Sequence, residues 1–250
     1  MSRQSVSFHG LSGTTLKLLA CAFMAIDHIG VRLLPNLVIL RILGRLAFPM
    51  FAFFLAEGCR YTKNKRRHFL LIFVIGVSYF LVYLLYSKRL YGNIFMTFSV
   101  SILMIYLMQW CKKQIFSKKK NAKRILAPVL FALALLGTYF LFEYVHFEYG
   151  YLGMLLPVLL NIWDFKGVSL PYRLSLDRKT EHALRIALLI VGLLVMCIDA
   201  NLGKIQFFSL LAVPFLALYN GKVGQRKMKY FFYVFYPTHL LIIEGLSYLL

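Results

Sequence analysis

The sequence predicts an all-α polytopic membrane protein, with about nine transmembrane helices in a single integral-membrane domain over residues 1–250. Sixty percent of the residues are apolar, and the mean hydropathy is +0.72. Apolar runs of about 20 residues recur along the chain, and this is the length that a helix needs to cross a bilayer. A chain of 250 residues has room for that many helices and short loops, but not for a soluble domain as well.

Charge clusters and turn residues divide the apolar runs into nine candidate helices. The first run ends at a proline, and most of the later ones are bounded by lysine and arginine. The sixth and eighth runs are short for a full crossing. The expected helices cover about residues 14–34, 37–58, 68–86, 94–111, 125–142, 150–163, 183–199, 205–219 and 231–249.

Basic residues in the loops predict the orientation, because they are retained on the cytoplasmic side of a membrane. With a cytoplasmic N-terminus and an extracytoplasmic C-terminus, the inner segments hold 21 lysines and arginines and the outer loops hold 3. The start of the chain lacks the features of a cleaved signal peptide, so we expect it to be retained. The sequence thus predicts a multi-pass protein of the bacterial plasma membrane.

The formal net charge of +20 is spread over separate inner loops. Such loops favour anionic lipid headgroups as partners. They lack the interleaved aromatic residues that nucleic-acid binding uses, so no nucleic-acid partner is expected. The four cysteines show neither a disulfide framework nor a metal-binding spacing, and no metal is expected.

Ionisable residues inside the apolar runs are the strongest indication of function, because a bilayer makes such groups costly. Asp27 and His28 lie slightly to the outer side of the middle of the first run. Arg41 and Arg45 are four residues apart, so they share one face in the outer half of the second. His239 lies near the middle of the last run. Further polar residues are expected towards the outer side: Asn93, Thr97, Glu143, His146, Glu148, Tyr149, Asp199, Asn201 and Gln206.

Each of these residues also has a structural interpretation. Asp27 and His28 would then be a packing pair satisfied by an arginine, and Arg41 and Arg45 would reach the outer headgroups. His239 would be a packed histidine with one hydrogen bond. Taken together, a histidine base, a carboxylate to orient it and arginines for an oxyanion are the groups that acyl transfer requires. The same set would serve a proton-coupled carrier of a small anion or lipid headgroup.

Several segments resemble the TraX family, in the order in which that family has them. They are LKLLACAFMAIDHIG, RILGRLAFPMFAFFLAEGCRYTKN, GNIFMTFSV, YGYLGMLL and ALYNGKVGQRKMKYFFYVFYPTHL, and they extend from about Leu16 to Leu240. The resemblance implies functional roles for these residues: Asp27, His28, Arg41, Gly44, Arg45, Pro49, Glu57, Gly58, Asn93, Thr97, Tyr149, Gly150, Asn220, Gly221, Tyr236, Pro237 and His239.

The resemblance also implies an activity, the transfer of an acetyl group from acetyl-CoA to the N-terminal amine of a pilin. We therefore expect acetyl-CoA to be the donor and an exported protein to be the acceptor. Alternatives are a cell-envelope glycan that is O-acetylated, a carrier of a small anion or lipid, and an assembly factor without catalysis.

The predicted site follows from this activity. Asp27 would orient His28, which would act as a base or carry the acetyl group, while Arg45 and Arg41 would stabilise the oxyanion and His239 would be a second acid or base. The expected substrate contacts are Asn93, Thr97, Tyr149, Asp199, Gln206 and Tyr236. Arg60, Lys63 or Lys227 would hold the phosphates of the cofactor at the cytoplasmic face.

Overall fold

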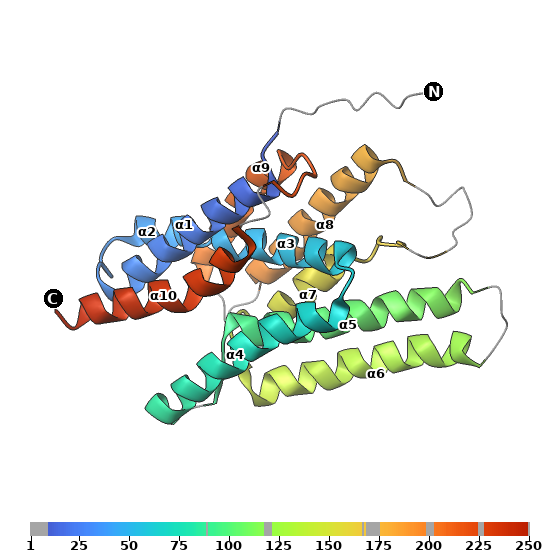
Figure 1. The fold of residues 1–250 in the computed structure, drawn as a ribbon, viewed down its shortest axis with the longest axis horizontal. Helices are drawn as coiled ribbons and strands as arrows, with labels where there is room; N and C mark the ends of the chain where they lie inside the picture. The colour runs from blue at the N-terminus through green and yellow to red at the C-terminus, as the bar shows by residue number, and fades with distance from the viewer. Residues whose placement is uncertain are drawn as a thin grey trace. The chain divides into compact units, whose positions relative to one another are not determined.

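The computed structural model is almost entirely helical (Figure 1). It describes residues 10–88, 90–117, 122–166, 168, 176–198, 203–224 and 228–249. Within these residues, 6 helices are long and apolar enough to cross a membrane. The chain is therefore an all-α polytopic membrane protein, as the sequence predicts.

Each of the nine expected runs has a helical counterpart among the described residues. Five of the six long candidates are single helices: α1 (Gly13–Arg32), α4 (Lys65–Ser87), α5 (Ile94–Ile115), α6 (Lys123–Tyr144) and α8 (Arg178–Ile198). The sixth, Val38–Tyr61, contains α2 (Val38–Gly44) and α3 (Ala47–Tyr61). Shorter elements are α7 (Gly150–Leu160), η3 (Lys204–Leu211) and α9 (Ala212–Ala217), and α10 (Lys229–Ser247) follows them. In the part of the chain that the structure describes, six helices are long and apolar enough to cross, against the nine crossings that the sequence predicts.

The expected helix over residues 37–58 is interrupted between α2 and α3, at Arg45 and Leu46. Proline explains the break. Pro49 has no N–H to donate to the carbonyl of Arg45 four residues earlier, and its ring would clash with that carbonyl in a straight helix. The backbone tightens instead, and the Leu46 N–H donates to the Leu43 carbonyl at 3.2 Å.

The chain divides into two compact units, the first formed by Met1–Phe51 with Ile205–Leu250 and the second by Ala52–Lys204. In the first unit, α1 and α10 run in the same direction, because Lys17 lies over the Phe232 ring and Arg32 pairs with Glu244 at 3.2 Å. Residues 38–44 of α2 run opposite to α1. In both units, helices that follow one another in the chain run in opposite directions.

A late loop of the first unit caps the start of α1. Leu11 forms a parallel bridge with Tyr219, and the Asn220 side chain donates to the Gly10 carbonyl at 2.8 Å. The Gly13 N–H donates to the Lys222 carbonyl at 2.8 Å. Gly224 has φ +80° and lies so close to the start of α1 that a Cβ there would meet side-chain atoms of Ser12 and Thr14. The YNGK segment, residues 219–222, therefore holds the beginning of α1.

In the second unit, α5 is the central helix. Of the residues in its most apolar stretch, 56% are buried, compared with 11% for α4 and for α6. The α4 helix is antiparallel to α5, since Lys65 bonds to Gln109 and Asn93 bonds to the Gly76 carbonyl. Two short strands that the sequence did not predict, β1 (Tyr91–Gly92) and β2 (His146–Phe147), pair in parallel beside the start of α5.

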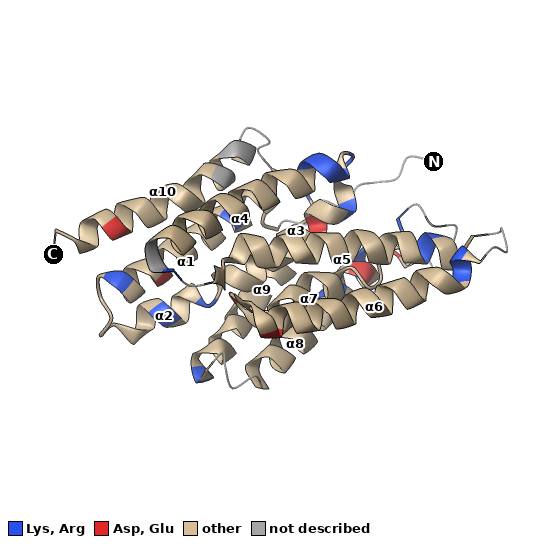
Figure 2. Cartoon of the chain, turned by 90° about the horizontal axis from the view of Figure 1, so that it is seen from below, with Lys and Arg blue, Asp and Glu red and all other residues tan. Residues whose placement is uncertain are grey.

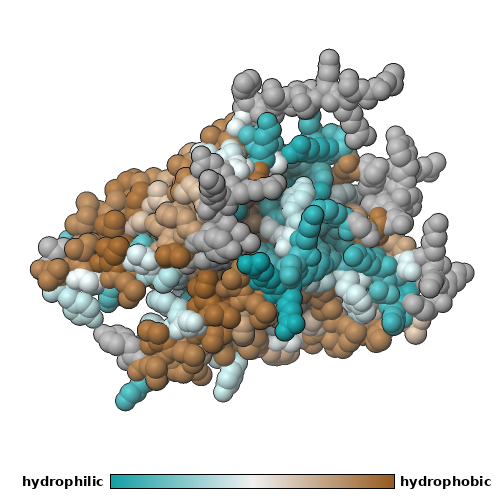
Figure 3. Space-filling model, viewed as in Figure 1, coloured by the Kyte–Doolittle hydropathy of each residue, from teal (hydrophilic) through white to brown (hydrophobic). Residues whose placement is uncertain are grey.

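Large apolar side chains remain exposed along the helices, as a lipid solvent allows. Leu85 on α4, Ile125 on α6 and Leu241 on α10 are 82%, 75% and 74% exposed. Hydrophobic residues cover much of the face in Figure 3, and hydrophilic residues gather around the end of α3. Lysine, arginine, aspartate and glutamate occupy few positions along the helices (Figure 2).

Candidate active site

A carboxylate on α1 faces two guanidinium groups at the C-terminal end of α2, within the first unit. Asp27 accepts from Nη2 of Arg45 with both oxygens at 3.0 Å, and Nη1 of Arg41 lies 2.8 Å from Oδ1. The side chains of Asp27 and Arg45 are each 14% exposed and that of Arg41 is 30% exposed. The predicted cluster of Asp27, Arg41 and Arg45 therefore forms in the structure.

Close approach of the two helices depends on glycine. A Cβ on Gly44 would overlap Oδ1, Cβ and Cγ of Asp27, and one on Gly30 would come within 2.8 Å of the Leu40 Cβ. Only a residue without a side chain lets α2 come near enough for Asp27 to reach both arginines.

His28 and His239 meet through their ring nitrogens. Nε2 of His239 lies 3.2 Å from Nδ1 of His28. Each Nδ1 also lies 2.9 Å from a carbonyl four residues earlier in its own helix, that of Met24 and that of Phe235. A carbonyl oxygen only accepts, so Nδ1 is the protonated nitrogen of both rings in the neutral form. Nε2 of His28 then keeps its lone pair, and no described residue donates to it.

Aromatic rings hold His239 in place. The Phe235 ring stacks on it, with centroids 4.9 Å apart and planes 9° apart. Tyr236, a predicted substrate contact, packs edge-on against the same ring at 5.5 Å and is only 6% exposed. The structure thus places Tyr236 beside the histidine pair.

The predicted orientation of His28 by Asp27 needs correction. Successive helical residues point about 100° apart, and Asp27 faces the two arginines while His28 faces α10. Its ring is oriented by the Met24 carbonyl and by His239. Asp27 instead positions the guanidinium groups, and the two arginines and one carboxylate carry a net charge of +1. An excess of fixed positive charge beside a basic nitrogen is suited to a reaction that develops an oxyanion.

A second polar cluster, the unit-2 cluster, lies within the second unit and was not predicted. Arg185 on α8 forms a buried ion pair with Glu57 on α3, donates to the Leu160 carbonyl at 3.3 Å and lies over the Phe53 ring. Nζ of Lys112 donates to the carbonyls of Asn161 and Asp164 at 2.8 and 3.1 Å. The sequence signals for this cluster are that Arg185 and Glu57 lie within apolar runs and that the family resemblance implies a role for Glu57. Neither signal predicts that the two residues pair.

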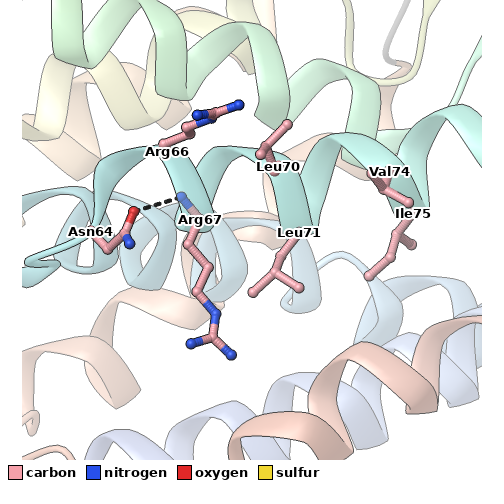
Figure 4. A pocket seen from close by; sticks show the side chains of 7 residues that line it. All are labelled: Asn64, Arg66, Arg67, Leu70, Leu71, Val74 and Ile75. Carbon is pink, nitrogen blue, oxygen red and sulfur yellow. Dashed lines mark hydrogen bonds between the residues drawn. The ribbon is translucent and has the colours of Figure 1, made fainter.

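Arg60, predicted to hold phosphate, belongs to the unit-2 cluster. It pairs with Glu181, and its Nε lies 3.6 Å from Asp164. Two carboxylates thus compensate its charge within the protein, which makes it a poor phosphate ligand. Lys63, by contrast, is exposed. Next to it, α4 and its cap line an open groove of about 390 Å³ with two arginines and an apolar stretch (Figure 4); its lining is Asn64, Arg66, Arg67, Leu70, Leu71, Val74 and Ile75.

The predicted substrate contacts Asn93 and Thr97 have structural partners in the second unit. Asn93 caps α5 by accepting from the N–H groups of Phe95 and Met96 at 2.9 and 3.2 Å, and it is 1% exposed. Thr97 donates to the Glu148 carbonyl at 2.9 Å and is fully buried. We therefore assign both residues to the support of α5 rather than to substrate.

The remaining predicted site residues differ in their positions. Tyr149 precedes α7 with φ +61° and is partly exposed. Gln206 is fully buried on η3 in the first unit. Asp199 and Lys227 lie outside the described residues. Among the described residues, no group of three or more histidine, cysteine or acidic side chains could hold a metal ion.

Comparison with known proteins matches nearly the whole chain to one family model. The model of a family described as TraX protein matches residues 12–247. A probable fimbrial assembly protein FimC, serogroup H1, of Dichelobacter nodosus is 23% identical over 93% of this chain and 94% of its own length. An uncharacterized protein of Rickettsia prowazekii is 48% identical over 62 residues, which cover 25% of this chain and 23% of that protein. No solved structure matches the chain.

Proposed function

The chain belongs to the TraX family, and from this premise we propose that it is a membrane acetyltransferase that uses acetyl-CoA. The acceptor is the N-terminal amine of a pilin-like or other exported protein. The similarity to a probable fimbrial assembly protein supports an acceptor connected with pili. The observation that carries the proposal is the free Nε2 of His28 in the same unit as the positively charged Asp27–Arg41–Arg45 cluster.

In the proposed reaction, the neutral amine attacks the thioester carbon, and Nε2 of His28 takes the proton that the amine loses. Arg41 and Arg45, held by Asp27, stabilise the negative oxygen of the tetrahedral intermediate. The carbon–sulfur bond then breaks, and His28 returns the proton to the thiolate. The products are the acetylated amine and CoA, and His28 regains its starting form.

His239 acts through His28 in this scheme. Its Nε2 accepts from Nδ1 of His28, and this bond stabilises the positive charge that His28 gains when Nε2 is protonated. Because Nδ1 of His239 faces the Phe235 carbonyl, His239 has no nitrogen left for the acceptor amine. His239 is therefore a positioning residue in the proposal.

The proposed topology has nine crossings, a cytoplasmic N-terminus and an extracytoplasmic C-terminus in the bacterial plasma membrane. The alternating directions of the helices within each unit support it. Acetyl-CoA would enter from the cytoplasmic side, where Lys63 and Lys227 are the remaining candidates for the phosphates. Arg66 and Arg67 line the groove on α4 (Figure 4). They are further candidates to bind the CoA phosphates or an anionic lipid headgroup.

Purified protein in detergent tests the proposal directly. We expect transfer of a radiolabelled acetyl group from acetyl-CoA to a peptide with a free N-terminus, and none to the same peptide with a blocked N-terminus. Transfer to a glycan hydroxyl alone would identify the O-acetyltransferase instead. Uptake of a small anion into proteoliposomes in the absence of CoA, with no acetyl transfer, would show the carrier and contradict the enzyme.

A further inference from the structure

Two side chains on η3 are buried without hydrogen bonds at any of their polar atoms. Gln206 and Ser209 are both 0% exposed. Nε2 and Oε1 of Gln206 and Oγ of Ser209 have no partner in the part of the chain that the structure describes. Buried polar groups are almost always bonded, so such a pair indicates a missing partner.

Other buried polar residues show how uncommon this is in the molecule. Arg45, Arg60, Asn161 and Arg185 each have one unbonded buried atom, but each has at least one other polar side-chain atom that is bonded. Among the described residues whose side chains are buried, only Gln206 and Ser209 are left with every polar side-chain atom unbonded. A simple defect of packing would not leave three such atoms within one turn.

The helix type brings the two residues together. In a 3₁₀-helix, side chains three residues apart lie directly above one another, so the amide of Gln206 and the hydroxyl of Ser209 share one face of η3. Together they present amide donors, an amide acceptor and a hydroxyl that can do both.

Contacts within the first unit place η3 towards the reactive end of α1. The Leu11–Tyr219 bridge and the edge-to-face pair of Phe23 and Phe215 hold α9 beside α1. The chain before α9 therefore runs towards the end of α1 that carries Asp27 and His28. Gln206 and Ser209 lie on that preceding segment.

We propose that Gln206 and Ser209 bind the amide groups of a linear substrate, which offers N–H and C=O groups in series. This inference rests on the proposed function, which supplies two such chains: the pantetheine arm of acetyl-CoA and the backbone of a peptide acceptor. Both carry the same secondary amide, and the experiment separates them.

The experiment compares Gln206→Met and Ser209→Ala with wild-type protein in detergent. Removal of an unbonded buried polar group costs no hydrogen bond, so both variants keep or raise the melting temperature without ligand. We expect at least a tenfold rise in Kd for one probe. The probes are CoA, adenosine 3′,5′-bisphosphate, which lacks the pantetheine amides, and an N-acetylated peptide, the product of the reaction.

Weaker binding of CoA with unchanged binding of the bisphosphate assigns the site to the pantetheine arm. Weaker binding of the acetylated peptide alone assigns it to the acceptor. Unchanged binding of all three probes, or a clear loss of melting temperature, overturns the proposal and leaves an ordered water as the partner. Because binding is measured without turnover, the proposed function can fail in the transfer assay while this site stands.

Ser101→Ala is the matched control. Ser101 is also fully buried, but its hydroxyl lies 2.8 Å from the Met154 carbonyl and 3.1 Å from that of Thr97. Its loss leaves carbonyl oxygens short of a donor, so we expect a lower melting temperature and unchanged binding of all three probes. The opposite behaviour of the two serines distinguishes a ligand contact from a structural bond.

Discussion

The two units of the molecule use buried polar residues in opposite ways. In the second unit, Arg185 is paired with Glu57, and Arg60 is paired with Asp164 and Glu181. In the first unit, two arginines share one carboxylate, and Nε2 of His28 is left without a donor. Both arrangements are costly in a membrane. The difference suggests a criterion for polar residues within a span: paired charges mark a structural cluster, and an excess of unpaired charge marks the candidate site.

His28→Ala should have the largest effect on this comparison. Loss of the proposed base should lower acetyl transfer by about 10²- to 10⁴-fold, with the melting temperature nearly unchanged. Radiolabel transfer to the free-amine peptide measures it. The control is His146→Ala, which removes an exposed histidine of β2 in the second unit; equal loss of transfer in both variants would contradict the assignment.

Arg185→Leu tests the second unit in the opposite sense. Removing one partner of a buried ion pair leaves the other charge uncompensated, at a cost of about 3–5 kcal/mol in the free energy of unfolding. Thermal unfolding in detergent measures the loss. The double variant Glu57→Leu with Arg185→Leu should recover much of it, and a double variant as unstable as the single one would argue against the pair as the cause.

Gly44→Ala should reduce activity more than stability. The added Cβ forces Asp27 away from α2, and a displacement of about 1 Å at a catalytic group can cost on the order of 10²-fold in rate. The transfer assay compares it with Gly245→Ala on α10, where a Cβ meets nothing within 4 Å. If both alanine variants keep full activity, the close approach is not required.

Asp177→Asn should have the smallest effect. The Thr180 hydroxyl and the Thr180 and Lys179 amides hold the pKa of Asp177 below its usual range. A lowered pKa in the folded protein stabilises it above the unfolded pKa of about 4, and that contribution disappears as the pH falls through the folded value. Melting temperatures at pH 7 should therefore be slightly lower for the variant, and the two proteins should converge in acid.

Much of the fold could be predicted, because apolar runs and basic loops reflect the bilayer directly. The break at Arg45 could have been anticipated from Pro49, whose ring disrupts the bond four residues back. The sequence predicted that Asp27, Arg41 and Arg45 lie towards the same side of the membrane. An arginine partner for Asp27 was expected only under the structural interpretation of the pair, since charges in a membrane find partners.

Other parts of the site depend on tertiary contacts that no local pattern contains. The pairing of His28 with His239 joins residues 211 positions apart. Asn93 was a plausible substrate contact by type, yet asparagine before a helix is also a common N-cap, and here it has that role. Ser209 carried no signal at all, because a serine in an apolar run is ordinary until its hydrogen bonds are known.

The cap that residues 219–224 place on α1 has a consequence for how the protein is made. During synthesis, α1 emerges from the ribosome about 200 residues before Tyr219 and Asn220, which bind the segment at its beginning. The second unit, continuous in sequence, is synthesised whole in that interval, and domains generally fold as units during synthesis. His239 emerges later still. The histidine pair is therefore among the last contacts to form, and a chain that is truncated or stalled before His239 cannot form it.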